Sequence, residues 1–266
     1  MKRYLVGALT LAFACLVAFA NDRLVAKDEP KSTQMRFEWR TEGPAERCGQ
    51  HCRTWISAIG VIAEGTSREF EAFARGRDLR GATLVLDSEG GSVLGALALG
   101  RAIRRLDITT SVGRTDVLPS SDGRATRVTL TPKASCESMC AFVLLGGARR
   151  YVPPEARVMV HQIWLGSKSK RALEATYSAE ELGLVQRDIG SLARYTIEMG
   201  GAIELIETAL RVPPWEPMYA LSAEELRRMR ITTVEQLFEA DVPTGSVPVA
   251  GPRALTTSAQ AQHGRD

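Results

Sequence analysis

Histidine and aromatic residues are scarce in this chain of 266 residues, which holds three histidines and 6% aromatic side chains. So few histidines exclude a His-rich metal site and leave little choice for a histidine base in catalysis. Neither sign of charge prevails, because 34 Lys and Arg stand against 31 Asp and Glu, for a net charge of +3. This balance argues against nucleic-acid binding as the main role, although a local basic patch stays open.

The composition is typical of a globular protein. Hydrophobic residues make up 44% of the chain and charged residues 24%, which excludes wholesale disorder and a fibrous repeat. The length suits one large domain or two small ones, either of which can bury a core. After residue 20, no apolar run is long enough to cross a membrane.

The N-terminus has the pattern of a secretory signal peptide over residues 1–20. Lys2 and Arg3 precede an apolar run of 17 residues that ends in Ala-Phe-Ala. We expect cleavage after Ala20 and hence a periplasmic or secreted protein; the alternative is an uncleaved membrane anchor, since the run is at the lower limit for a span. Cleavage also removes Cys15, which leaves four of the five cysteines, and lowers the net charge from +3 to +1.

Composition divides the rest of the chain into three parts. Residues 21–46 are polar and are expected to form a linker, and residues 241–266 are rich in Pro, Gly and Ser and are expected to be disordered. Between them, residues 47–240 alternate strand and helix patterns, which predicts an α/β domain with a mostly parallel sheet. The expected strands are 55–62, 82–87, 109–113 and 157–161, and the expected helices are 67–75, 93–105 and most of 172–210.

A pair of glycines separates one expected strand from the helix that follows it. Gly90 and Gly91 turn the chain after Asp87, and such a turn can aim backbone N–H groups at an anion or oxyanion. The spacing matches neither of the glycine patterns of nucleotide-binding loops. A tight strand-to-helix turn without a ligand is the alternative interpretation.

A serine and a histidine follow at positions where catalytic groups can lie. Ser138 stands midway between Cys136 and Cys140, before an apolar run over 141–145 that suits a helix or a strand. It could be a nucleophile or a helix cap. His161 ends an apolar strand pattern, where it could be a general base or a structural residue.

Taken together, the glycine turn, Ser138-Met139 and the segment 157–162 resemble the proteolytic subunit of the Clp protease (ClpP). The resemblance covers residues 55–240 and is closest to exported Clp-like periplasmic proteins with cysteines around the serine. It implies a spiral of ββα units, a fold shared with crotonases, and serine peptidase chemistry on a peptide or protein without a cofactor. It also implies association into a homo-oligomer.

The resemblance assigns roles by position. Ser138 would be the nucleophile and His161 the general base, and the N–H groups of Gly91 and Met139 would form the oxyanion hole. The third member of the triad has no clear equivalent, because no aspartate stands at the expected place. Glu216 is the nearest carboxylate, slightly out of register, and Asp188 is a less favoured substitute.

The four remaining cysteines form two pairs of equal spacing. Export favours disulfides, and our preferred pairing joins Cys48 to Cys52 and Cys136 to Cys140. Crossed pairing, a four-thiolate zinc site and a cysteine nucleophile are alternatives; we expect no metal.

Two segments depart from the pattern of that family. Residues 114–133 are an insertion that could form a lid, a partner-binding hairpin or a surface loop, and residues 166–171 are expected to form a basic, solvated loop. The leading hypothesis is an exported serine hydrolase acting as a peptidase. The main alternative is a catalytically silent binding or scaffold protein of the same fold. A crotonase-type acyl-CoA enzyme is less favoured, since its chemistry does not need Ser138 and His161.

Overall fold

The computed structural model describes residues 33–43, 52–119, 126–166 and 173–238. The chain divides into two units, Met1–Pro30 and Lys31–Asp266, and all of the described residues belong to the second. The expected signal peptide and the expected C-terminal tail lie outside the described residues, so these two segments stay predictions. Among the described helices, none is long and apolar enough to cross a membrane.

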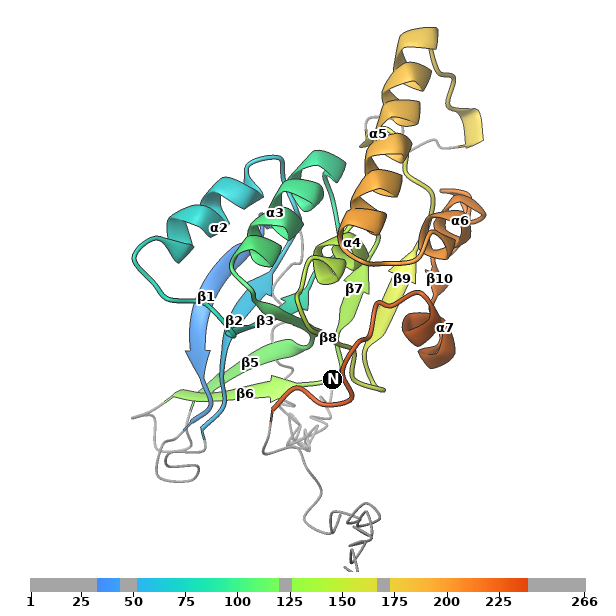
Figure 1. The fold of residues 1–266 in the computed structure, drawn as a ribbon. Coiled ribbons are helices and arrows are strands. Elements are labelled where there is room, and N and C mark those ends of the chain that lie inside the picture. Colours follow the sequence, from blue (N-terminus) through green and yellow to red (C-terminus); the bar gives the residue numbers. More distant parts are fainter. Residues whose placement is uncertain (1–32, 44–51, 120–125, 167–172, 239–266) are drawn as a thin grey trace, which may run out of the picture. The chain divides into compact units, whose positions relative to one another are not determined.

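A five-stranded sheet forms the centre of this unit (Figure 1). Four of its strands are parallel to one another, and the first strand pairs antiparallel at one edge. The mixed α/β class and the mostly parallel sheet predicted from the sequence are therefore present, while the spiral of ββα units stays a prediction. In sheet order the strands are β1 (Arg36–Thr41), β2 (Thr54–Ile59), β3 (Thr83–Asp87), β4 (Thr109–Val112) and β8 (Arg150–Tyr151).

Strand β1 lies within the segment that we expected to be a linker. Its Phe37 ring lies 5.1 Å from the ring of Phe70 and 6.3 Å from that of Phe73, measured between centroids. Met35, two residues earlier, is fully buried. The expectation of a linker therefore does not hold here, because a short alternation of apolar and polar side chains is enough to form an edge strand.

The described residues form the helices α2 to α7. Helices α2 and α3 lie side by side on one face of the main sheet (Figure 1). Helix α3 has the bounds predicted from the sequence, since Ser92 Oγ caps it by accepting from Gly95 N at 3.1 Å. The bounds are α2 (Thr66–Ala74), α3 (Val93–Arg105), α4 (Cys140–Leu145), α5 (Ala179–Glu198), α6 (Glu204–Leu210) and α7 (Ala223–Arg228).

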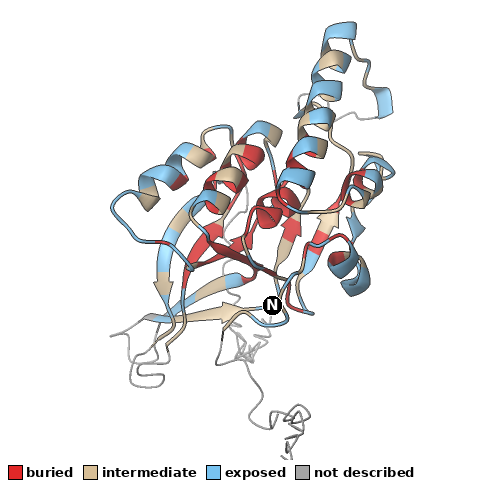
Figure 2. Ribbon diagram, viewed as in Figure 1, coloured by how far each residue is buried: buried red, intermediate tan, exposed pale blue. Residues whose placement is uncertain are grey.

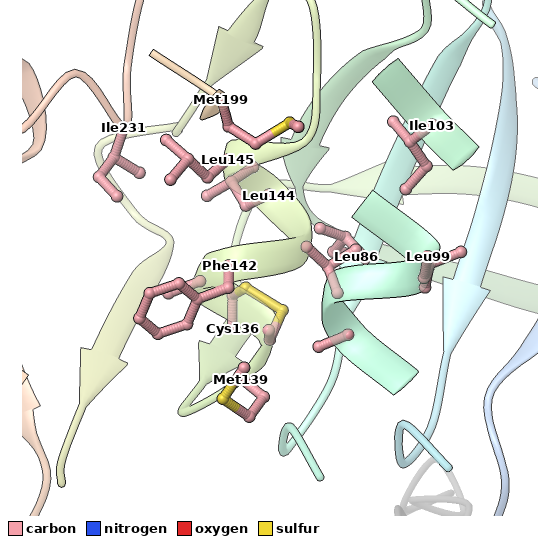
Figure 3. Packing of buried hydrophobic residues seen from close by; sticks show 14 of the residues in the cluster. Leu86, Leu99, Ile103, Cys136, Met139, Phe142, Leu144, Leu145, Met199 and Ile231 are labelled. Atoms are coloured by element: carbon pink, nitrogen blue, oxygen red, sulfur yellow. A yellow bond between two sulfur atoms is a disulfide. The ribbon is translucent and has the colours of Figure 1, made fainter. Parts of the chain in front are cut away.

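The apolar run that suited either a strand or a helix forms α4, and all of its residues are buried. Figures 2 and 3 show this helix in the interior, between α3 on one side and the end of α5 on the other. The close packing depends on glycine, since a Cβ on Gly100 would collide with the hydroxyl of Tyr195. That hydroxyl donates to Phe142 O at 2.8 Å, so α3, α4 and α5 meet at one point.

A second, three-stranded sheet carries the serine and histidine segments. Its central strand β9 (Arg157–Val160) pairs parallel with β7 (Ser135–Glu137) and antiparallel with β10 (Tyr219–Ala220). Ser88, just after β3, donates through its N–H to Ser135 O at 3.1 Å and accepts from Glu137 N at 2.9 Å. These bonds hold the end of β3 beside β7, and thus the glycine turn beside the serine turn.

The inserted segment 114–133 forms a hairpin and not an irregular loop. Strand β5 (Arg114–Pro119) pairs antiparallel with β6 (Thr126–Thr131), and the residues that join them lie outside the described part of the chain. Trp55 Nε1 on β2 donates to Thr115 Oγ1 at 2.9 Å, which ties the hairpin to the main sheet. Whether the hairpin acts as a lid or binds a partner stays a prediction.

The chain beyond α7 returns to the main sheet. Thr233 Oγ1 accepts from Arg150 N at 2.9 Å, and Thr233 N donates to Arg150 O at 2.9 Å. The segment after α7 therefore lies along strand β8, the last strand of the sheet.

Candidate active site

Ser138 forms the turn between β7 and α4. Its backbone has a φ of +52°, a conformation that costs a residue with a side chain about 1–2 kcal/mol. Such a conformation persists only where the surroundings hold it, and here Ser138 N donates to Met159 O at 2.7 Å. Because the bond comes from the neighbouring strand β9, the sheet itself holds the serine in place.

The glycine turn touches the serine turn from the other side. Gly90 has a φ of +87°, and a Cβ added there would lie 2.6 Å from Glu137 O and 2.9 Å from Ser138 Cβ. Gly91, at a φ of +139°, would collide with Ile62 O if it carried a side chain. Both glycines are thus required by a positive φ and by a close approach of backbones.

Two backbone N–H groups at this junction are available to a ligand. Among the described residues, no acceptor takes a hydrogen bond from Gly91 N or from Met139 N. Gly91 is exposed, and Met139 lies at the N-terminal end of α4. Free N–H donors of this kind suit an oxyanion, and the assignment of Gly91 and Met139 to an oxyanion hole stays a prediction.

His161 follows strand β9 and lies at the same site. Its Nδ1 is 2.8 Å from the carbonyl oxygen of Gln162, and its ring meets that of Trp164 edge-on with the centroids 5.9 Å apart. A neutral imidazole whose Nδ1–H donates to this carbonyl leaves Nε2 unprotonated. Nε2 is therefore the nitrogen that could accept a proton from a nucleophile.

Ser138 and His161 line one small cavity. Its volume of about 10 Å³ is close to the least that holds a single water molecule. The wall is otherwise apolar, so a bound acyl group would be shielded from water, and side chains must move apart to admit a substrate. The remaining lining residues are Met139, Phe142, Val160, Ile163, Ile189, Leu192, Ile206, Ala209 and Leu210.

The part of this lining that α5 and α6 supply was not predicted from the sequence. Ile189 and Leu192 recur at helical spacing on α5, a signal that shows a buried face but not what that face covers. The Gln162 carbonyl was also missed, because a backbone group leaves no mark in a sequence. Only the motif residues could be found before the chain was folded.

No carboxylate of the described residues is bonded to His161. Glu216 is exposed and its N–H donates to Pro213 O at 3.1 Å, and no hydrogen bond joins it to the histidine. Asp188 on α5 is half-buried, and burial raises the pKa of its carboxyl while Arg187 partly opposes that rise. The structure thus brings together Ser138, His161 and Met139, and places a carbonyl where a triad would place an acid.

A disulfide joins Cys136 to Cys140 across the serine, with the two Cα atoms 5.1 Å apart. This half of the preferred pairing is confirmed, and crossed pairing is wrong. The bonded sulfurs are also unavailable as zinc ligands or as nucleophiles. Cys52 is disulfide-bonded as well, but Cys48 lies outside the described residues, so their pairing stays a prediction. Within the described residues, no cluster of His, Cys, Asp and Glu could hold a metal ion.

Comparison with known proteins adds one structural similarity. No family model matches the chain, and no curated protein matches it. Among solved structures the chain is similar to a ClpP1 mutant from Listeria monocytogenes, with 15% sequence identity and a TM-score of 0.42, over 65% of this chain and 84% of that chain. The residue roles proposed below are supported by the geometry of the site and by the sequence motifs, and not by this similarity.

Proposed function

We propose that the protein is a serine hydrolase that cleaves peptides or proteins, with Ser138 as nucleophile and His161 as general base. The observation that carries the proposal is that both residues line one apolar cavity at the junction of β7, α4 and β9. The strained backbone of Ser138 supports the same role, because strain at a residue with a side chain gathers at functional sites.

The reaction follows from the groups at the site. His161 Nε2 takes the proton from Ser138 Oγ as that oxygen attacks the substrate carbonyl carbon, and the N–H groups of Met139 and Gly91 stabilise the oxyanion. The imidazolium then returns the proton to the leaving amine, and the C–N bond breaks. A water molecule, deprotonated in turn by His161, hydrolyses the acyl-enzyme. These steps need no cofactor.

The carbonyl of Gln162 takes the part that a carboxylate plays in a triad. It accepts a hydrogen bond from Nδ1–H and so holds the imidazole in the tautomer that leaves Nε2 free. A neutral carbonyl stabilises the imidazolium less than an anion does. We therefore expect a working dyad that is slower than a full Ser-His-Asp triad.

A fluorophosphonate probe tests the proposal directly, because it phosphonylates only an activated serine. We expect labelling of the protein at neutral pH and its loss in Ser138→Ala. Ser191→Ala is the matched control, since the Ser191 hydroxyl donates to Arg187 O on α5 and does not line the cavity. Absence of labelling, or labelling that survives in Ser138→Ala, would contradict the proposal.

Two observations favour a second candidate, a silent binding or scaffold protein. His161 has a backbone carbonyl and not a carboxylate on Nδ1, and the cavity holds only about 10 Å³. Under this alternative, Ser138→Ala keeps the protein's role in the cell at unchanged abundance. A loss of that role in Ser138→Ala, with the protein still present, decides for the hydrolase.

The proposal includes export and self-association. Cleavage after Ala20 would give a mature chain that begins at Asn21, and N-terminal sequencing of the protein from a periplasmic or culture fraction checks it. An intact start at Met1 in the membrane fraction would instead indicate an uncleaved anchor.

A further inference from the structure

The Cys136–Cys140 disulfide connects the two elements that meet at Ser138. Cys136 is the middle residue of β7, and Cys140 is the first residue of α4. Both residues are fully buried, and Figure 3 shows the bond in the interior beside Met139 and Phe142. The bond therefore closes a short loop whose midpoint is the proposed nucleophile.

We propose that Cys136 and Cys140 are positioning residues, whose bond holds Ser138 at positive φ and so keeps its hydroxyl in the cavity with His161. This inference deepens the proposed function and rests on it for its catalytic consequence. Its structural part, that the bond determines the backbone of Ser138, can be measured without any reaction.

The argument begins with what fixes the chain on each side of the serine. Before it, Cys136 and Glu137 are held in the ladder between β7 and β9. After it, α4 is buried throughout. The reversal from strand to helix must therefore occur at Ser138 and Met139, and the positive φ falls on Ser138.

The disulfide then limits the conformations that this turn can adopt, because it limits the distance between the two Cα atoms. Four residue steps of extended chain span about 13 Å, whereas the Cα atoms of Cys136 and Cys140 are 5.1 Å apart. A disulfide tolerates Cα separations of only about 4.4–6.8 Å, so every open form of the loop is excluded. Without the bond, Ser138 could relax to the negative φ that residues with a side chain prefer. Its N–H bond to Met159 O, the bond that its carbonyl accepts from Ala141 N at 3.1 Å and the contact with Gly90 would then oppose that change without a covalent restraint.

Burial makes the bond a permanent part of the site. Since both cysteines are fully buried, a dithiol reductant cannot reach the sulfurs until the protein unfolds. We therefore expect the native protein to keep its labelling rate in a dithiol reductant. The bond acts as a fixed clamp on the serine turn and not as a switch.

The test compares the oxidised protein with Cys136→Ala/Cys140→Ala. The first readout is the three-bond HN–Hα coupling of Ser138, which depends on φ; the pair Glu-Ser occurs once in the chain, so ¹³C-carbonyl Glu with ¹⁵N-Ser isolates this amide. The second is fluorophosphonate labelling, split into kinact and KI. We expect the coupling to change and kinact to fall about tenfold, equivalent to about 1.4 kcal/mol, with KI within about twofold because the apolar lining is untouched.

Two further samples make the result decisive. Cys48→Ala/Cys52→Ala is the control, and it should leave the coupling and kinact unchanged. Should the first variant not fold, the native sequence unfolded and refolded in a dithiol replaces it; there the dithiol is oxidised to its own disulfide and passes two electrons and two protons to the two sulfurs.

The outcomes separate the two proposals. An unchanged Ser138 coupling and an unchanged kinact without the bond overturn the positioning role, while labelling of the native protein still supports the hydrolase. A changed coupling in a protein that is never labelled supports the structural role of the bond and contradicts the hydrolase.

Discussion

Gly90 and Ser138 are in contact while both hold a positive φ. A serine does not prefer a positive φ, so the conformation of Ser138 depends on its contact with the glycine turn. The shape of each turn therefore depends on the other. Only a residue without a side chain at position 90 lets the Ser138 backbone come this close. At the residue scale, the site is therefore a contact between two turns more than a set of side chains.

Gly90→Ala should reduce both stability and labelling. A Cβ there would lie 2.9 Å from Met139 N, so the serine turn must shift. The matched control is Gly200→Ala, because Gly200 also has a positive φ, of +71°, but would have nothing within 4 Å of its Cβ. We expect each variant to lose about 1 kcal/mol from the torsion.

Gly90→Ala should lose about 1–3 kcal/mol more from the clash, together with most of its fluorophosphonate labelling. Urea unfolding and the labelling rate measure the two effects. Equal losses of stability in the two variants, with labelling intact, would show that the turns are not coupled.

At this scale the sequence motifs predicted which residues form the candidate site. They did not predict the backbone contacts that hold those residues. The glycine turn, Ser138 and His161 follow one another in an order that is visible in the sequence, so these candidate residues could be named before the structure was known. The partner of His161 Nδ1 could not be predicted. It is the backbone carbonyl of Gln162, and because every residue has such a group, it leaves no mark in the sequence. Positive φ at Ser138 also has no sequence signature, since it depends on contacts with β9 and Gly90 and, as we propose, on the Cys136–Cys140 bond.

At the scale of elements, strong local signals succeeded and weak ones failed. Helix α3 was predicted to the residue because a cap at Ser92 and an apolar period agree. Strand β1 was missed because its apolar positions are few, and its partner strand decides its conformation. The two-residue strands β8 and β10 are too short for any pattern. These elements exist through tertiary pairing alone.

Two arginines hold the ends of α4 and α5 together. Arg150 is buried and donates to Gly147 O at 3.0 Å and to Arg230 O at 2.8 Å, and Arg104 donates to Gly147 O at 2.8 Å and to Met199 O at 3.1 Å. Burial, with the charge of Arg104, lowers the pKa of Arg150 to about 10, so the guanidinium stays charged at neutral pH. Its partners are carbonyls at helix ends, which favour a cation.

Arg150→Met should therefore destabilise the protein by about 3 kcal/mol, because it removes a buried guanidinium that bonds several carbonyls and leaves Arg230 O without its donor. The free energy of unfolding in urea measures the loss. Arg228→Met is the control: Arg228 is half exposed and pairs with Glu224 at 3.8 Å, so its loss should cost less than about 1 kcal/mol. Similar values for the two variants would contradict the structural role of Arg150.

On the scale of the whole molecule, α5 is divided between two environments. Its buried residues are Leu192, Tyr195 and Thr196, all in its second half, while Leu182 and Leu184 near its start are 49% and 40% exposed. Figures 1 and 2 show this first half extending away from the sheets. Exposed apolar side chains on a projecting helix are the surface at which we expect copies of the chain to associate.

Leu182→Glu/Leu184→Glu should shift the protein from an oligomer to a monomer, since two charges would be placed on that surface. Sedimentation velocity measures the change. Val117→Glu is the control, because Val117 is 44% exposed but lies on the hairpin strand β5. A native protein that sediments as a monomer at all concentrations would contradict this prediction.

The return of the chain to strand β8 has a consequence for the limits of the folded unit. Thr233 forms hydrogen bonds with both the N–H and the C=O group of Arg150 on β8, the last strand of the sheet. An uncovered edge strand can pair with another molecule. The segment after α7 thus protects this end of the sheet against edge-to-edge aggregation. Truncation before Thr233 would remove that protection, so we expect a fragment that resists aggregation to reach beyond α7.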